Sequence, residues 1–500
     1  MRSWGRWRKM PRRYASPRRS SALRAGLIAG AVCALLSIAP GGSTAAMPAP
    51  ASGLDRATSA RIDALAQREI DEGHAPGISL GVGRGDTLLY ARGYGEADVG
   101  SHVPAGPETT YAIGSLTKQF TAAAILLLAQ DGRLSIDDAL SAYVPELSGS
   151  AEITLRELLQ QRSGVPDYTR VPGLDPTRAI GWRAFIDGVN RLPAEFTPGS
   201  AYRYNNLNYL LLGKVVERVS GASLGAFIAK RIARPLRLTS SGMLSERQPE
   251  AAGYTSVGNA LVPARRWDPS LLGGAGGFLS SVVDLVHWDA ALFGGRVLSP
   301  PSLALMTTPG GEESYAMGWV SERRGEEQLL WHNGELGGFQ AMNAVLPKRE
   351  LFVVVLENVD GLHAPTLQPD VLARRIIAAL EPESAFGEEA AAQEHALPAD
   401  PALAERVTRW VAQFEAARID RAEVTPEMAA ALTPDLVRRT AAAWAALGAL
   451  SGIEILGREQ RNALDVYILR LEFARGPFVW KITLTRDGKL AGAGDLEPAR

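Results

Sequence analysis

Segments with the pattern of β-strands stand at both ends of the first 380 residues, and a long helical stretch lies between them. Near the start, "GISLGVGRGDTLLYARGYGEAD" predicts two strands joined by a turn at Arg84 to Asp86. Near the end, "QLLWHNG", "GFQAMNAVLP" and "LFVVVLEN" predict three more. The two sets most simply form one antiparallel sheet, with predicted helices at 54–72 and 366–380 packed on one face. We therefore expect an α+β fold with an inserted helical lobe and a cleft between sheet and lobe.

Length and local composition predict more than one folding unit. Five hundred residues exceed what a single hydrophobic core usually accommodates. We assign residues 47–380 to the first domain and residues 381–400, which are acidic and rich in alanine, to a linker. Residues 401–500 contain a predicted helix near 426–447 and three alternating strand segments. This pattern predicts a small α+β accessory domain.

Residues 1–46 have the order of a secretory signal peptide. A basic segment up to Arg24 is followed by an apolar stretch of about fifteen residues and then by small residues. Cleavage is expected near Ala45 and Ala46, which predicts a periplasmic or secreted protein and leaves the export route open. The alternative is a membrane anchor, but a spanning helix needs ~20 residues, so no stable membrane span is expected after signal removal. Because Cys33 is the only cysteine, the mature chain could form neither a disulfide nor a cysteine-ligated metal site.

A serine and a lysine three positions apart begin a strongly apolar predicted helix. They are Ser115 and Lys118 in "YAIGSLTKQF", and the helix continues to about Gly132. Residues i and i+3 share a helix face, and burial lowers the pKa of a lysine. Lys118 could therefore take the proton of Ser115 and make its oxygen a nucleophile. The plainer alternative is a capping serine followed by a surface lysine.

Two further pairs of polar residues stand at the ends of predicted elements. Tyr204 and Asn206 precede a helix in "AYRYNNLNYLLLG". A phenol beside a lysine could be driven toward phenolate and serve as a base, whereas the plainer alternative makes Asn206 a helix cap. His332 and Gly334 stand at a strand end in "WHNGELGGF". The glycine would let a ligand approach closely and the histidine could hydrogen-bond a substrate, although such a histidine is more often structural.

Several other kinds of site are disfavoured. "GASLG" has the G-x-S-x-G pattern of a nucleophile elbow, but a helical rather than a strand pattern precedes it, so Ser223 fits better as a helix cap. The glycine cluster "GGAGGF" lacks the lysine and hydroxyl of a phosphate-binding loop. The six histidines show no metal-binding spacing, and we expect no metal and no cofactor. A formal net charge of −1 argues against nucleic acid as a partner.

The order of these motifs resembles the serine hydrolases related to class C β-lactamases and penicillin-binding proteins. The resemblance covers roughly residues 55–380, and includes "ITLRELLQQRSGVPDY" and "AGGFLSSVVDLVHW". It implies that Ser115 is acylated and that Lys118 and Tyr204 share proton transfer. It also implies that Asn206 holds the substrate, that His332 stands where many relatives carry lysine, and that the backbone N–H groups of Ser115 and Glu335 form the oxyanion hole. Residues 401–500 have a distant resemblance to ketosteroid-isomerase-like domains.

Two departures from the family pattern bear on the substrate. An imidazole at His332 is largely neutral near pH 7, so we expect weaker recognition of a substrate carboxylate. Arg162 replaces a histidine that relatives often carry, which should alter the cleft wall. The expected function is hydrolysis of an ester, amide or β-lactam carbonyl in a small-molecule or peptide acyl substrate. The alternatives are a binding protein that keeps the fold without turnover, and an unrelated structural protein in which the serine–lysine spacing is accidental.

Overall fold

The computed structural model describes most of the chain after its N-terminal segment. The described ranges are 53–257, 260–311, 313–361, 368–387, 400–461 and 464–493. The predicted signal peptide, residues 1–46, lies outside them, as do residues 388–399 of the predicted linker.

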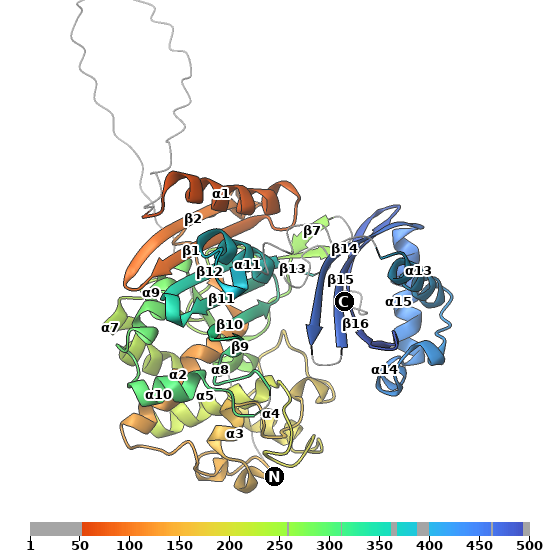
Figure 1. Cartoon of the computed structure of the whole chain (residues 1–500). Coiled ribbons are helices and arrows are strands. Elements are labelled where there is room, and N and C mark those ends of the chain that lie inside the picture. The colour runs from red at the N-terminus through yellow and green to blue at the C-terminus, as the bar shows by residue number, and fades with distance from the viewer. Residues whose placement is uncertain are drawn as a thin grey trace, which may run out of the picture. The chain divides into compact units, whose positions relative to one another are not determined.

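The first part of the chain is built on a seven-stranded sheet (Figure 1). Its two sequence-distant halves are joined by β1 and β12, which pair antiparallel from Ile78–Glu357 to Arg84–Leu351. This confirms the single antiparallel sheet predicted from the sequence, whereas the short edge strands were not predicted. The strands, in their order across the sheet, are β3 (Val103–Pro104), β2 (Thr87–Asp98), β1 (Gly77–Arg84), β12 (Leu351–Glu357), β11 (Phe339–Leu346), β10 (Glu327–Leu336) and β9 (Val320–Arg324).

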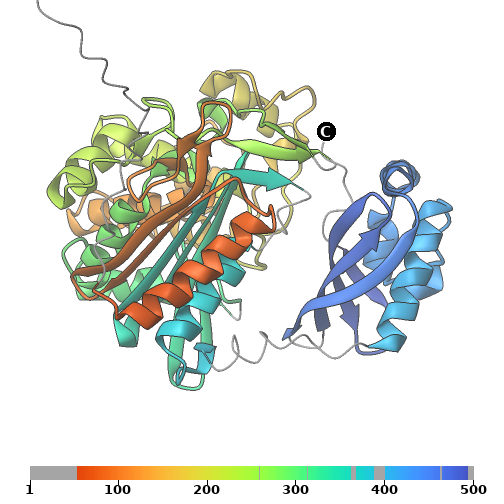
Figure 2. The same cartoon turned by 90° about the horizontal axis from the view of Figure 1, so that it is seen from above.

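Helices α1 (Arg56–Asp71) and α11 (Gln368–Leu380) lie side by side on one face of this sheet, as Figure 2 shows. They cover a hydrophobic core that includes Ile62 of α1, Ile376 of α11 and Val353 of β12. The prediction that the first and last helices share one face is therefore confirmed.

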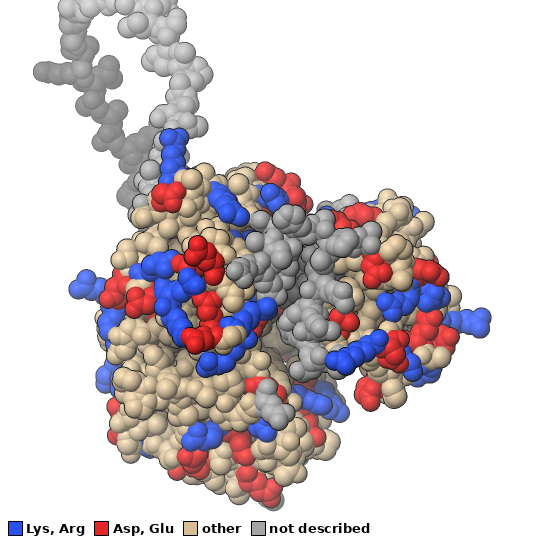
Figure 3. Space-filling view, viewed as in Figure 1, with Lys and Arg blue, Asp and Glu red and all other residues tan. Residues whose placement is uncertain are grey.

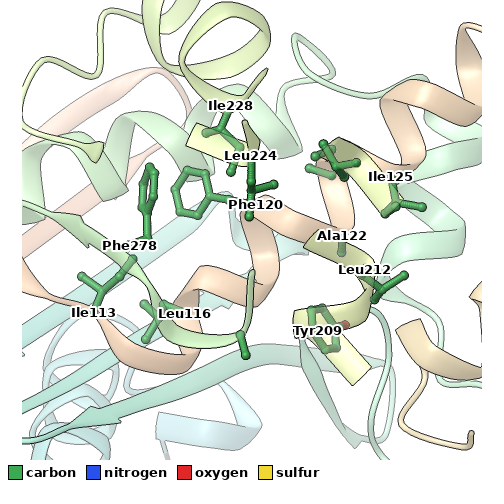
Figure 4. Close-up of a cluster of buried hydrophobic side chains, with 14 of the residues drawn as sticks. Ile113, Leu116, Phe120, Ala122, Ile125, Tyr209, Leu212, Leu224, Ile228 and Phe278 are labelled. Atoms are coloured by element: carbon green, nitrogen blue, oxygen red, sulfur yellow. The ribbon is translucent and has the colours of Figure 1, made fainter. Parts of the chain in front are cut away.

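The opposite face carries α9 (Val282–Phe293) and the helical lobe, with α2 (Thr117–Gln130) at its centre. Every residue of α2 from Thr117 to Leu128 is buried, and Figure 4 shows apolar side chains such as Phe120, Leu212 and Phe278 packed around this helix. The remaining elements of this part are β4 (Tyr111–Ala112), α3 (Leu155–Leu159), α4 (Trp182–Val189), α5 (Asn206–Ser220), α6 (Leu224–Ile228), α7 (Arg234–Leu236), β5 (Gly242–Met243), β6 (Tyr254–Val257), β7 (Ala260–Pro263), α8 (Gly273–Gly276), β8 (Phe278–Ser280), α10 (Pro300–Thr307) and β13 (Val359–Gly361).

Residues 381–387, which were predicted to belong to a linker, pack against the rest of the first part of the chain. Phe386 is buried in the core beneath α1 and α11. The carboxylate of Glu381 binds the guanidinium groups of Arg84 and Arg349, at 2.5 and 2.6 Å. This segment therefore packs onto the sheet, because an acidic, alanine-rich composition does not reveal one aromatic anchor and one paired carboxylate.

The C-terminal part has its own hydrophobic core and sheet. Strands β14 (Leu450–Arg461), β15 (Leu464–Phe473), β16 (Gly476–Thr485) and β17 (Leu490–Ala493) form an antiparallel sheet in that order. Its core is aromatic, with the rings of Trp444 and Trp480 5.2 Å apart. The helices are α13 (Pro401–Glu415), α14 (Pro426–Ala431) and α15 (Pro434–Leu447). Helix α13 was not predicted, and the single helix expected near 426–447 is two helices because Thr433 caps α15.

The face of the molecule in Figure 3 shows no strong bias of charge among the described residues. On the face in Figure 3, basic and acidic residues are interspersed rather than gathered by sign. Within the described ranges, none of the helices has the length and apolarity needed to cross a bilayer.

Candidate active site

Ser115 lies in a tight turn that leads directly into α2. The turn is a single 3-10 turn, Gly114–Leu116. Gly114 adopts φ +49°, and a Cβ at this position would lie 2.7 Å from the backbone of Glu335, so only glycine fits. Ser115 is half-buried between two buried neighbours. The turn thus presents a hydroxyl at the edge of the core.

Lys118 is fully buried, although it is a lysine in the first turn of α2. Its Nζ lies 2.8 Å from each of three oxygens: Oγ of Ser115, Oδ1 of Asn206 and the carbonyl oxygen of Ala275. Burial holds the pKa of this amine well below 10.5. The pairing with Ser115 that the i, i+3 spacing predicts is therefore present in the structure.

Asn206 and its neighbour Asn205 have different tasks at the start of α5. Asn205 is the helix cap, with Oδ1 accepting a hydrogen bond from the backbone N–H of Leu207 at 2.9 Å. The side chain of Asn206 is thereby left to contact Lys118. The alternative in which Asn206 caps the helix is wrong.

Tyr204 donates a hydrogen bond from its hydroxyl to Oγ of Ser115 at 2.8 Å. The ring also lies over the ammonium position of Lys118, with Nζ 4.8 Å from the ring centroid. Tyr204 as a residue is 39% exposed, but the surrounding site desolvates its hydroxyl and raises the pKa of the phenol, which the hydrogen bond to Ser115 only partly opposes. The raised pKa does not favour a phenolate in the resting site.

The carbonyl that holds Lys118 comes from the glycine cluster, for which the sequence indicated no role in the chemistry. The cluster forms the short helix α8, and Gly274 of α8 accepts a hydrogen bond from Thr121 of α2 at 2.8 Å. A Cβ at Gly274 would lie 2.5 Å from the carbonyl oxygen of Tyr209. The run of glycines therefore lets α8 pack between α2 and α5, which brings the oxygen of Ala275 to the amine.

Strand β10 passes close to the turn that carries Ser115. Gly334 is buried, and a Cβ there would lie 2.0 Å from the carbonyl oxygen of Ile113. The close approach expected at this glycine is therefore made by the protein's own backbone and not by a ligand. Glu335 follows as an exposed residue, and its backbone N is the nearest atom to the space a Gly114 side chain would take.

His332 of β10 is buried and neutral. Burial, and secondarily the charge of Lys118, lowers its pKa to about 3. Nδ1 lies 2.6 Å from the carbonyl oxygen of Asn333, which can only accept, so Nδ1 carries the proton. Nε2 then faces the hydroxyl of Tyr315 at 3.4 Å, and the ring centroid is 6.0 Å from that of Tyr204. Tyr315 is a site neighbour that no sequence motif indicated.

Two other sequence expectations concern residues near this region. Arg162 binds Glu313 and the carbonyl of Gly199, each at 2.7 Å, so it is committed to an ion pair. Ser223 caps α6 through a hydrogen bond from Ala226 at 3.1 Å, and α5 precedes it, so the nucleophile-elbow alternative is excluded as expected. Within the described residues, no three His, Cys, Asp or Glu side chains gather as metal ligands would.

The three contacts of Lys118 are compatible with both protonation states, since an ammonium could donate one N–H to each of the three oxygens. The carbonyl of Ala275 accepts only, and Oδ1 of Asn206 also accepts. A neutral amine would use its two N–H groups for these oxygens and its lone pair for the O–H of Ser115. The hydroxyl of Tyr204 already donates to Oγ of Ser115, so when the amine is neutral its lone pair can accept the serine proton. The arrangement can remove a proton from Ser115 without any rearrangement.

Comparisons with known proteins show the family and the fold of the chain. A family model described as "Beta-lactamase" matches residues 62–376. The protein named "Protein flp" of Staphylococcus aureus strain COL is 32% identical over 341 residues, which are 61% of this chain and 64% of that protein. The chain thus spans less than two thirds of that relative's length.

Among solved structures, a D-stereospecific amidohydrolase from Streptomyces is 26% identical with a TM-score of 0.54, over 61% of this chain and 95% of that one. An octameric penicillin-binding protein homologue from Pyrococcus abyssi is 24% identical with a TM-score of 0.58, over 85% of this chain and 90% of that one. At 24% identity, the similarity to the penicillin-binding protein homologue shows only that the two proteins share a fold.

Proposed function

Because this chain belongs to the beta-lactamase family, we propose that it is an exported serine hydrolase that works through an acyl-enzyme on Ser115. A serine hydrolase type of function follows from the family and from the amidohydrolase among its structural neighbours. The observation that carries the proposed mechanism is the 2.8 Å contact between Nζ of the fully buried Lys118 and Oγ of Ser115.

The proposed first step is attack of Oγ of Ser115 on the substrate carbonyl. The serine proton passes to the neutral amine of Lys118, whose pKa is lowered by burial. When the bond to the leaving group breaks, that proton is delivered to the leaving oxygen or nitrogen, with Tyr204 as the hydroxyl that can relay it. Water then attacks the acyl-enzyme and loses a proton to the same amine. The bond between the acyl carbon and Oγ of Ser115 breaks, the amine returns that proton to Oγ, and the acid product leaves.

The negative charge that develops on the substrate oxygen requires hydrogen-bond donors. We assign this role to the backbone N–H groups of Ser115 and Glu335. The assignment is supported by the close approach of β10 to the serine turn, where Gly114 and Gly334 both lack room for a side chain. Loss of one such donor typically costs about 2.7–4 kcal/mol in other hydrolases.

The proposed substrate is an ester or amide without a carboxylate that must be bound by β10. At His332 the strand offers a neutral ring with a pKa of about 3, and not a fixed cation. The D-stereospecific amidohydrolase among the structural neighbours favours an amide of a D-amino acid over a β-lactam. In this proposal Asn206 orients Lys118 as well as the substrate.

Two parts of the proposal concern the rest of the chain. Export depends on residues 1–46, whose sequence has the order of a signal peptide. Residues 401–500 are proposed to be an accessory domain, because they have a separate hydrophobic core and no acid–base set was found in their sequence. The catalytic domain then comprises the chain from residue 47 to the segment packed on its sheet.

The test uses the chain without residues 1–46. A fluorophosphonate probe should add mass to Ser115 in the wild type and not in Ser115→Ala. Initial rates should then be compared for a p-nitrophenyl ester, D- and L-amino-acid amides, and a chromogenic cephalosporin. Turnover of the ester or D-amide that is lost in Ser115→Ala supports the proposal. Labelling without turnover would support a binding protein, and absence of labelling in folded protein would overturn the assignment of Ser115.

A further inference from the structure

Three polar side chains meet in the interior between α2, α9 and β11. They are Gln119, Asp289 and Asn343, and each is 0% exposed. Nδ2 of Asn343 lies 2.9 Å from Oδ1 of Asp289 and 3.3 Å from Oε1 of Gln119. The amide of Asn343 therefore connects all three elements.

The hydrogen bonds of this trio do not balance if Asp289 is ionised. Oδ2 of Asp289 and Oδ1 of Asn343 are then two buried acceptors without a partner, while Nε2 of Gln119 is the one unpaired buried donor of the trio, too few for both oxygens. A proton on Oδ2 would make it a donor that can satisfy Oδ1 of Asn343. A carboxylic acid and a primary amide can form two such hydrogen bonds face to face, and the cost of two unpaired buried oxygens is removed.

Reversing the amide of Asn343 leads to the same conclusion. The assignment of nitrogen and oxygen in an amide is a choice based on its partners. With the amide turned over, its oxygen would lie 2.9 Å from Oδ1 of Asp289, and two acceptors at that distance need a proton between them. Either orientation therefore calls for a protonated acid.

The electrostatic surroundings agree with a neutral acid. The amide of Asn343 contacts Asp289 from β11 and also contacts the amide of Gln119 on α2, and neither amide carries a charge. Helix α9 also packs on β1, β2, β12 and α7, and no charged group among the described residues of these elements contributes to the pKa of Asp289. Burial raises the pKa of Asp289 well above 3.8, and the hydrogen bond from Asn343 is the opposing influence. Within the described part of the chain, no cation contributes to this pKa.

We propose that Asp289 is a neutral carboxylic acid that donates its proton to Asn343, and that this acid–amide pair positions α2 next to the reactive lysine. Gln119, which accepts from Asn343, directly follows Lys118 in the sequence. Asp289 touches none of the reacting atoms, so it is a positioning residue. Only this positioning role rests on the proposed function; the protonation state does not.

The variant Asp289→Asn tests the protonation state, because an amide has the shape of the neutral acid and also offers a donor and an acceptor. The unfolded aspartate ionises near 3.8, so a raised folded pKa makes the wild type lose stability as pH rises above that value. The urea midpoint of Asp289→Asn should therefore rise relative to that of the wild type as the pH increases from 4. The difference should stop growing once the pH exceeds the pKa of Asp289 in the folded protein.

Asp63→Asn is the matched control. Asp63 accepts hydrogen bonds from Tyr94 and Arg92 at 2.7 and 2.8 Å, and its pKa is lowered. This variant should have a lower midpoint than wild type at neutral pH, with a difference that stays constant above pH 5. A midpoint of Asp289→Asn that is below wild type and equally constant would overturn the proposal, since it would show an ionised Asp289.

Infrared spectroscopy and kinetics separate the two halves of the proposal. Asp289→Asn should remove one component of the protonated-carboxyl band at neutral pH, whether or not the protein turns over a substrate; the buried carboxyl of Glu357, whose pKa is also raised, can account for what remains. For the positioning role, Asp289→Ala should lower kcat at least tenfold with little change in KM, and Asp289→Asn should restore kcat to within twofold of wild type. Equal kcat in Asp289→Ala and wild type would overturn that role.

Discussion

The Nζ of Lys118 and the Oδ1 of Asn206 are 2.8 Å apart, although the two residues belong to different helices. This contact joins the first turn of α2 to the first turn of α5. It depends on Asn205, because a cap one residue earlier leaves the side chain of Asn206 unused by the helix. The position of the cap therefore decides which asparagine can orient the amine.

Replacing Asn206 with alanine should reduce turnover more than stability. One N–H of the buried amine would lose its acceptor, which costs about 1–3 kcal/mol of stability, and an amine no longer held toward Ser115 should lower kcat/KM by about a hundredfold. Steady-state kinetics with a p-nitrophenyl ester, together with urea unfolding, would measure both quantities.

The adjacent variant Asn205→Ala is the natural control for Asn206→Ala. It removes the cap of α5 and the hydrogen bond to the carbonyl of Val165, so stability should fall by about 1–2 kcal/mol. If both variants lost stability and activity in the same proportion, the separate task assigned to Asn206 would be wrong.

Lys118→Arg should be as inactive as Lys118→Ala. The guanidinium of an arginine does not release its proton in proteins, and it cannot accept the proton of Ser115. We expect kcat to fall by at least about a hundredfold, within the range of general base catalysis. Near-normal turnover in Lys118→Arg would show that the residue supplies only a positive charge.

The rate should also fall at acidic pH. Because burial lowers the pKa of Lys118, the amine is neutral over a wider range of pH than a free lysine, and acid protonates it. The pH profile of kcat/KM in the wild type should therefore show an acidic limb well below 10.5. A profile that rises only near the pKa of a free lysine would contradict the lowered pKa.

Much of the fold could be predicted from the sequence, because the signals for its strands and helices lie within short segments of the chain. The alternating strands and the apolar helix after Ser115 have clear periodicity, and the pairing of Ser115 with Lys118 follows from helix geometry. The site residues that were missed act through backbone or through packing. The carbonyl of Ala275 has no side-chain signal, and Tyr315 comes from a loop whose place beside His332 depends on tertiary structure.

The direction of two pKa shifts also could not be read from residue types. Proximity of a lysine predicted an acidic phenol at Tyr204, but desolvation of its hydroxyl by the site raises the pKa although the residue is 39% exposed. Burial of His332 lowers the pKa of its ring from 6.5 to about 3, which is a larger shift than its residue type indicates. Desolvation depends on the whole three-dimensional neighbourhood, which motifs and spacing do not contain.

His332→Gln should weaken the loss of stability in acid. The folded pKa of about 3 lies below the unfolded value of 6.5. The stabilising contribution is therefore present above 6.5 and is lost as pH falls toward 3. In the wild type this one group can remove up to about 1.4 kcal/mol per pH unit in that window. Urea unfolding at pH 7.5, 6.0 and 4.5 should show a shallower decline in the variant, and an unchanged decline would mean that His332 is protonated when folded.

Gly334→Ala tests the contact between β10 and the serine turn. The new Cβ would lie 2.0 Å from the carbonyl oxygen of Ile113 and 2.9 Å from Cδ1 of Leu116, so the strand or the turn must move. Such overpacking usually costs about 1–3 kcal/mol. If the N–H of Glu335 is an oxyanion donor, the same shift should lower kcat by at least about tenfold in protein that remains folded.

Gly181→Ala is the matched control for this glycine, since a Cβ there meets nothing within 4 Å. It should leave kcat unchanged. An intact kcat in Gly334→Ala, with the expected loss of stability, would separate packing from catalysis and would remove β10 from the proposed oxyanion hole. The backbone of β10 matters here because the hydroxyl of Ser115 can attack only where the charge it creates is met by donors that are already in place.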